Sequence, residues 1–182
     1  MRREWLKRRT KSVNPNADQE ITQEMQMVKN IVLVCFVALI ASACDSTGIY
    51  DQNISTDNEA WNRKSVARFE VNITDTLSAN NVYINLRNTS DYPNSNLYLF
   101  VTTTAPNGAT IKDTLECILA DSYGKWLGKG VGKIKDNQIP YKRMVKFPVS
   151  GTYTFEVEQA MRVESLPGIV NVGLRIERAQ SN

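Results

Sequence analysis

The sequence predicts an all-β fold, a single antiparallel β-sandwich of jelly-roll-like size. Three observations lead to this fold class. Apolar and polar residues alternate with a period of two in most segments after Val66, turn-forming residues separate these segments, and no long helical period occurs among them. About seven or eight short strands follow from this pattern, which suits two antiparallel sheets packed face to face.

An N-terminal extension and a lipoprotein signal peptide are predicted ahead of this domain, over residues 1–43. Lys29 precedes an apolar run, Ile31 to Ala43, that ends in small residues directly before Cys44. A membrane-spanning helix needs about 20 apolar residues, and this run is shorter. The order of these features is typical of a bacterial lipobox, and it fits less well with a buried helix or an incidental cysteine. We therefore expect lipid attachment at Cys44, through acyl chains such as palmitate that hold the chain on a membrane.

The segment before Lys29 is charged and long for a signal peptide, and a start at Met25 or Met27 in place of Met1 would give a signal of ordinary length. The chain has 22 basic and 19 acidic residues, of which seven and four lie in residues 1–43. The mature chain therefore keeps 15 of each and is formally neutral. Its charge gives no reason to expect a nucleic-acid partner.

The mature chain is long enough for one domain with a hydrophobic core and too short for two comfortable ones. Residues 44–62 are polar and are interrupted by Gly48, so we predict that they form a flexible tether. Residues 63–182 are predicted to form the β-sandwich, and Trp61 is expected where the tether meets it.

Alternation predicts four strands that each carry one apolar face. Such strands suit an antiparallel sheet that has one face on the core and the other in water. The four strands, with their inward side chains, are 67–73 (Phe69, Val71, Ile73), 82–88 (Val82, Ile84, Leu86), 152–159 (Tyr153, Phe155, Val157) and 172–178 (Val172, Leu174, Ile176).

A further strand, 97–104, begins with five apolar residues. This run predicts a central strand that is either covered on both faces or carries aromatic side chains outward. The sharpest turn signal follows it, because Pro106 presets one backbone angle and Asn107-Gly108 tolerates positive ones. We expect strands 97–104 and 110–119 to form a hairpin.

Residues that usually carry catalysis or bind cofactors are sparse. The chain has no histidine, which excludes Ser-His-Asp and Cys-His catalysis and histidine metal sites. Cys117 alternates with apolar residues and is predicted to be a buried, inert thiol. The glycine-rich residues 121–134 lack the spacing of a nucleotide-binding loop, and we predict turns packed over Trp126 and Leu127. We expect no enzyme activity, no cofactor and no metal site.

Basic residues gather between residues 125 and 146, where seven of them face only Asp136. This run has a net charge of +6, which leaves −6 on the rest of the mature chain. One interpretation is an ordinary solvated strand face. The other is a docking patch for an acidic partner or anionic lipid. The basic residues are Lys125, Lys129, Lys133, Lys135, Lys142, Arg143 and Lys146.

Four long blocks resemble the GldH family of gliding-motility lipoproteins, in the same order. They read YINLRNTSDYPNSNLYLFVTTTAPNG, DTLECILADSYGKWLGKGVGKIKDNQ, FPVSGTYTFEVEQAMR and VGLRIE. The resemblance covers roughly residues 50–177 and extends to the lipidated cysteine, Cys44. It implies a lipoprotein anchored to a membrane of the cell envelope, on the periplasmic or surface side. It also implies a role in the gliding machinery and its associated type IX secretion apparatus, through contacts with envelope proteins and without catalytic residues.

A lipid-anchored carbohydrate-binding module of the cell envelope is the alternative function. Sandwiches of this size often bind glycans, and four aromatic residues could stack on sugar rings. Aromatic residues at such spacings are more often part of a core. No pair of carboxylates has a spacing that indicates a glycosidase. The four aromatic residues are Trp61, Trp126, Tyr92 and Tyr141.

Overall fold

The computed structural model describes residues 25–27, 29 and 48–180. The chain divides into two compact units, Met1–Ser46 and Thr47–Asn182. The described residues of the first unit are helical and solvent-exposed, and within the described parts of the chain no helix has the length and hydropathy needed to cross a membrane. The predicted apolar run and Cys44 lie outside the described residues.

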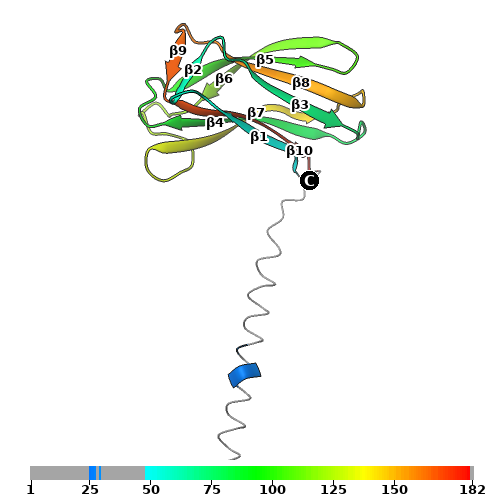
Figure 1. Ribbon diagram of the computed structural model, residues 1–182, viewed down its shortest axis with the longest axis horizontal. Coiled ribbons are helices and arrows are strands. Elements are labelled where there is room, and N and C mark those ends of the chain that lie inside the picture. Colours follow the sequence, from blue (N-terminus) through cyan, green and yellow to red (C-terminus); the bar gives the residue numbers. More distant parts are fainter. Residues whose placement is uncertain (1–24, 28, 30–47, 181–182) are drawn as a thin grey trace, which may run out of the picture. The chain divides into compact units, whose positions relative to one another are not determined.

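Two four-stranded antiparallel sheets pack face to face in the second unit, as the lower and upper layers of Figure 1 show. The predicted all-β sandwich is confirmed. In spatial order, sheet I consists of β1 (Gly48–Ser55), β10 (Ile169–Arg178), β4 (Asn80–Thr89) and β7 (Ile134–Val145). Sheet II consists of β3 (Ala67–Ile73), β8 (Gly151–Gln159), β5 (Asn96–Thr104) and β6 (Thr110–Ile118). A short two-stranded ladder pairs β2 (Ala60–Asn62) with β9 (Ser165–Pro167).

The four alternating strands build the core between the sheets. The inward side chains predicted for β3, β4, β8 and β10 are all at most 3% exposed. Phe155 of β8 is 2% exposed, and its ring meets that of Phe147 edge-on with the centroids 6.4 Å apart. Because burial of apolar surface contributes about 25 cal/mol per Å², this interior is the main source of the domain's stability.

The predicted hairpin between β5 and β6 is confirmed. The two strands pair from Asn96 opposite Ile118 to Thr104 opposite Thr110, and Gly108 closes the turn with a φ of 82°. β5 is a central strand because it also pairs with β8. Tyr98 and Phe100 are 39% and 37% exposed, so this strand carries aromatic side chains outward and is not covered on both faces.

The tether predicted over residues 44–62 is wrong from Gly48 onward. β1 pairs with β10 from Gly48 opposite Glu177 to Ser55 opposite Asn171, and Trp61 of β2 is 2% exposed in the core. β1 is an edge strand, and nearly all of its side chains are exposed to solvent. Because neither face is buried, its sequence lacks the alternation of apolar and polar residues by which the other strands were predicted. The sandwich therefore begins well before residue 63.

Strand β7 was not predicted as a strand. It is an edge strand, 12 residues long, and its charged residues and Pro140 interrupt the alternation of apolar and polar residues. Proline lacks a backbone N–H and is tolerated on a sheet edge. The preceding residues 119–133, which we call the β6–β7 loop, contain the predicted turns. Trp126 is half-buried there, whereas Leu127 is 57% exposed, so the expected packing of Leu127 is wrong.

Candidate functional site

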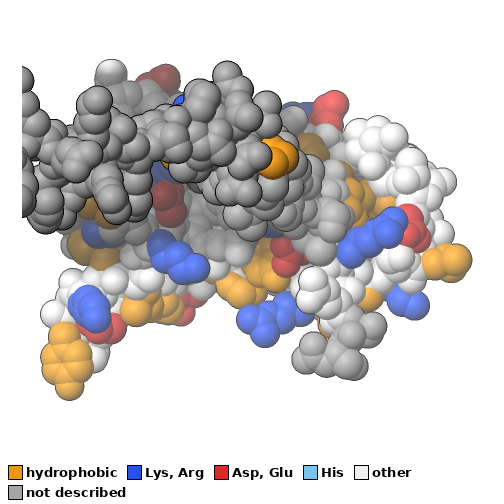
Figure 2. All heavy atoms as spheres, turned by 90° about the horizontal axis from the view of Figure 1, so that it is seen from below, with side chains coloured by type: hydrophobic (Ala, Val, Ile, Leu, Met, Phe, Trp, Pro, Cys, Tyr) orange, Lys and Arg blue, Asp and Glu red, His pale blue; other side chains and the backbone are white. Residues whose placement is uncertain are grey.

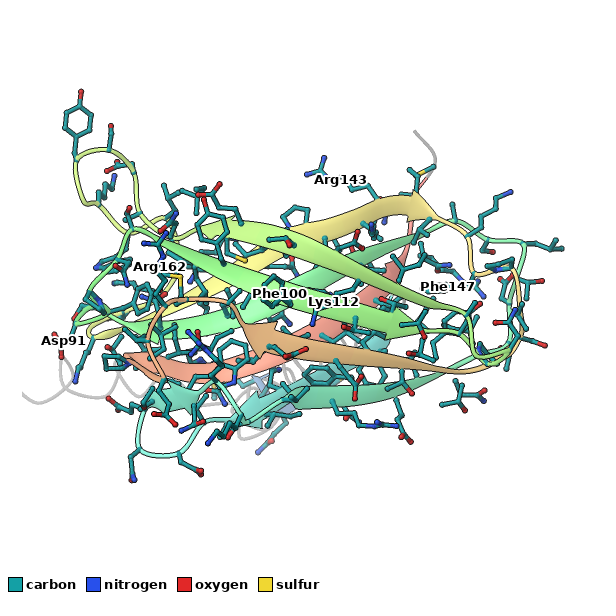
Figure 3. The ribbon with its side chains drawn as sticks, turned by 90° about the horizontal axis from the view of Figure 1, so that it is seen from above. Asp91, Phe100, Lys112, Arg143, Phe147 and Arg162 are labelled. Carbon is teal, nitrogen blue, oxygen red and sulfur yellow. The ribbon has the colours of Figure 1, made fainter. Side chains whose placement is uncertain are left out.

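The seven basic residues of the run do not form one patch. Four of them lie in the β6–β7 loop or at the start of β7, and Lys142, Arg143 and Lys146 lie at or just after its end. Residues Ile134 and Val145 of β7 are about 36 Å apart at the usual rise of 3.3 Å per residue. Figure 3 shows this separation, because Asp91, the ion-pair partner of Lys133, lies at the opposite end of the sandwich from Phe147.

Two of the seven basic residues are neutralised by local ion pairs. Lys133 Nζ lies 2.9 Å from an Asp91 carboxylate oxygen and 3.7 Å from one of Glu59, and hydrogen bonding to Asp91 is the main cause that raises the pKa of Lys133. Lys142 Nζ lies 2.9 Å from an oxygen of Asp113. Tyr141 donates to the same carboxylate over 2.6 Å, and this hydrogen bond is the main cause that lowers the pKa of Asp113. These lysines are parts of the fold's ion-pair network.

The other basic residues are available for contacts. Lys135 Nζ donates to the backbone oxygen of Gly130 over 3.4 Å. Within residues 48–180 no carboxylate lies at ion-pair distance from Lys125, Lys129, Arg143 or Lys146. Figure 2 looks onto the molecule from the side of sheet I, and its coloured part shows Lys and Arg scattered among polar and apolar side chains.

The β6–β7 loop exposes large apolar side chains that the sequence analysis missed. Tyr123 is 95% exposed, Val131 is 100% exposed and Leu127 is 57% exposed. A signal for them does exist in the sequence, since Tyr123 precedes Gly124, and Val131 stands between two glycines with no strand to bury it. Lys125 and Lys129 are exposed on the same loop. Apolar and basic side chains therefore occur together on one projecting segment.

Backbone hydrogen bonds hold this loop in shape. Asp121 Oδ1 accepts from the backbone N–H groups of Tyr123 and Lys125, each over 2.9 Å, and Gly124 has a φ of 78° that suits glycine. Lys129 exchanges two backbone hydrogen bonds with Asp136 of β7, at 2.8 and 2.7 Å. Tyr123 is thus presented on a tight turn that these hydrogen bonds stabilise.

A polar cleft is the second feature of this side of the molecule. It has a volume of about 580 Å³ and is bounded by β1, β4 and β7, by the last residue of β6 and by the β6–β7 loop. Amide, carboxylate and guanidinium groups line it together with a few aliphatic side chains. The lining side chains on the outer face of sheet I include Asp51, Asn53, Asn85, Arg87, Asp136 and Gln138.

The four aromatic residues considered for glycan stacking do not form an exposed platform. Trp61 and Tyr92 are 2% and 3% exposed, and Trp126 packs against Tyr92 with the ring centroids 6.4 Å apart. Burial is the main cause that raises the pKa of Tyr92 to about 12. Tyr141 is half-buried against the core. These rings stabilise the sandwich, so the aromatic argument for a carbohydrate-binding module is wrong.

Chemical groups for catalysis are not assembled in the described residues. Cys117 is 0% exposed, as predicted, and burial raises the pKa of its thiol to about 12, so it stays protonated near neutral pH. Among the described residues no group of three or more Cys, Asp or Glu side chains could hold a metal ion.

Solved structures give weak likenesses. The chain matches a protein of the T13 particle of IBDV with a TM-score of 0.35 and 17% identity, over 73% of this chain and 32% of that one. It matches a protein of the infectious bursal disease virus Gx strain with a TM-score of 0.31 and 11% identity, over 76% of this chain and 34% of that one. The chain thus spans about a third of the length of each viral protein.

Protein families and curated relatives give a clear match. The family model described as GldH lipoprotein matches residues 48–176. A gliding motility lipoprotein GldH homolog of Christiangramia forsetii is 35% identical over 164 residues, which cover 86% of this chain and all of that protein. The gliding motility lipoprotein GldH of Flavobacterium johnsoniae is 35% identical over 158 residues, which cover 83% and 98% of the two chains. The chain belongs to the GldH family of gliding-motility lipoproteins.

Proposed function

We propose that this protein is a membrane-anchored component of the gliding machinery and of its associated type IX secretion apparatus, and that it acts by binding envelope proteins. Membership of a lipoprotein family supports the anchor, with Cys44 as the acylated residue, and the names of the relatives support the motility role. The exposed β6–β7 loop is the observation that carries the contact mechanism. No catalytic step is part of this proposal.

The composition of the β6–β7 loop suits a protein partner. Interfaces concentrate their binding energy in aromatic and other large side chains that become desolvated on binding. Tyr123, Leu127 and Val131 supply such side chains, and they are exposed in the free protein. Lys125 and Lys129 add positive charge beside them, which favours an acidic partner and speeds encounter with it. Because the turn at Tyr123 is fixed in advance, binding orders few groups and loses little entropy.

The position of the loop in the fold also suits this role. Cys44 precedes the first residue of β1, Gly48, by four residues, a stretch that spans at most about 14 Å. The lipid-bearing segment therefore joins the sandwich where β1 begins. The β6–β7 loop leads into Ile134, which is opposite the end of β4, at the other end of the sheet. Strand β10 runs between these two ends and is about 30 Å long, so the loop lies at the end of sheet I opposite the start of β1.

Charge reversal tests the proposal with a matched control. Lys125→Glu with Lys129→Glu changes the loop without breaking a described ion pair, and Arg143→Glu with Lys146→Glu makes the same charge change at the other end. Lys133 is left unchanged because its reversal would break the ion pairs with Asp91 and Glu59. We expect the loop variant to lose gliding and secretion, and to lose salt-sensitive capture of an envelope component of either machinery from detergent-solubilised membranes. The control should keep all three properties, and equal behaviour of both variants would contradict the role of the loop.

A further inference from the structure

The outer face of sheet I carries rows of polar side chains that four strands bring into register. Gly173 of β10 pairs with Asn53 of β1 on one side and with Asn85 of β4 on the other, and Asn85 pairs with Gln138 of β7. These four residues form one continuous row across the sheet. Three of its four members are amides, which both donate and accept hydrogen bonds.

Most charged groups at this cleft are paired with one another. Arg87 of β4 bonds to Asp136 of β7 over 2.5 Å. Arg175 of β10 lies 2.8 Å from an oxygen of Asp51 and 3.1 Å from an oxygen of Glu177. Lys129 also lines the cleft and has no carboxylate partner within residues 48–180. The four charged side chains of the lining, Asp51, Arg87, Lys129 and Asp136, nevertheless sum to zero, so the cleft has no strong preference for a charged ligand. The amides beside them are neutral.

Two of the amides keep their hydrogen-bonding groups available. Within residues 48–180 the side chains of Asn53 and Gln138 make no hydrogen bond to the protein, and both residues are exposed. Asn85 makes a long bond of 3.4 Å from its Nδ2 to Asp51. The row therefore offers donors and acceptors to a molecule that lies across the strands.

Gly173 gives the side chain of Asn53 room to lie against the sheet in the middle of this row. A Cβ atom at this position would lie 2.1 Å from Asn53 Oδ1 and 2.8 Å from the backbone oxygen of Gln52. Any side chain at this position would therefore displace the amide of Asn53. The glycine therefore fixes where the Asn53 amide lies in the row.

The outer face of sheet II provides an internal comparison. There, long side chains form ordinary surface ion pairs, with Arg68 3.1 Å from Glu156 and Lys112 3.3 Å from Glu158. Lys112 also lies over the ring of Phe100, 4.8 Å from its centroid, as Figure 3 shows. Both sheets have a solvated face, but short amides around a glycine are a property of sheet I.

We propose that the cleft on sheet I binds a neutral, polyhydroxylated ligand, namely a segment of an uncharged glycan. Sugar hydroxyls occur in adjacent pairs that an amide can bind with one donor and one acceptor, and the balanced charges of the cleft lining give no advantage to an acidic polymer. The exposed aliphatic side chains of Ile118 and Leu127, which also line the cleft, suit the C–H faces of sugar rings. The volume of about 580 Å³ lies within the range of about 300–1,000 Å³ that is common for ligand sites. The cleft shares Leu127 and Lys129 with the β6–β7 loop, but this inference does not rest on the motility role proposed above.

The test uses mature lipidated protein in detergent micelles and a panel of purified oligosaccharides. Neutral glucan, mannan and xylan hexamers are the probes, and oligogalacturonate of the same length is the charged comparison. Asn53→Ala with Gln138→Ala should weaken binding of the preferred neutral hexamer about tenfold or more, because two neutral hydrogen bonds are lost. Asn72→Ala with Thr102→Ala, on the outer face of sheet II, should leave binding unchanged.

A second measurement avoids dependence on the variants' folding. In the wild-type protein, addition of the bound hexamer should shift the side-chain amide NMR signals of Asn53, Asn85 and Gln138 and leave that of Asn72 in place. Three outcomes would overturn the inference: no binding of any neutral hexamer, a preference for oligogalacturonate, or unchanged affinity and unshifted amide signals at the sheet I row.

Discussion

Replacement of Phe155 tests whether the interior between the sheets stabilises the fold as described. The side chain is 2% exposed, lies opposite Phe69 of β3 and meets the ring of Phe147 edge-on. Burial of a phenylalanine contributes about 1.5–3 kcal/mol, and an aromatic pair adds about 0.5–1.5 kcal/mol. With the cavity that remains, Phe155→Ala should reduce the free energy of unfolding by about 3–5 kcal/mol.

Urea denaturation of the mature protein, followed by circular dichroism, measures this loss in the free energy of unfolding. Tyr123→Ala is the matched control, because this aromatic side chain is 95% exposed. Its free energy of unfolding should change by less than about 0.5 kcal/mol. If Phe155→Ala lost less than about 1 kcal/mol, or no more than the control, the assignment of β8's inner face would be refuted.

Three further predictions concern the anchor and two titratable groups. Cys44→Ala should leave a protein without incorporated palmitate, and equal labelling of wild type and variant would end the lipoprotein assignment. The thiol of Cys117, whose pKa burial raises to about 12, should resist maleimide at pH 7.5 until denaturant is added, so prompt labelling of the native protein would show that the thiol is accessible. Ser78 donates hydrogen bonds to Asp75 and lowers the pKa of that carboxyl from 3.8 to about 2. Because the pKa is lower in the folded state, this stabilisation is present above about pH 4 and is lost as the pH falls toward 2. Asp75→Asn should therefore have a lower free energy of unfolding than the wild type at pH 6, and this free energy should fall less steeply in acid. A parallel fall in the two proteins would contradict the prediction.

The parts of the fold that the sequence predicts are those whose signal is local. Phe69, Val71 and Ile73 alternate with polar residues because one face of β3 is buried, and the Pro106 to Gly108 turn specifies its own hairpin. β1 could not be predicted this way. Its position depends on β10, a strand more than a hundred residues later, and its exposed side chains carry no periodic signal.

The candidate sites were less accessible to sequence reasoning. A run of basic residues suggested one patch, but an extended β7 separates its two ends by about 36 Å, and local carboxylates neutralise Lys133 and Lys142. The amide row on sheet I joins residues from four strands, and only their register brings Asn53 and Gln138 to the same face. The outward asparagines of β4 are visible in the sequence, but they indicate a polar row only when their neighbours across the sheet are known.

Photo-crosslinking in living cells tests most directly whether the β6–β7 loop is the contact surface of this lipoprotein. A photoreactive amino acid replaces Tyr123 in one strain and Met144, which is 60% exposed near the anchored end, in another. The account predicts that the Tyr123 position crosslinks to an envelope protein of the gliding or secretion machinery, that the Met144 position does not form this product, and that Lys125→Glu with Lys129→Glu removes it. An absence of crosslinks at the Tyr123 position in cells that glide and secrete normally, or the same product from both positions, would contradict it.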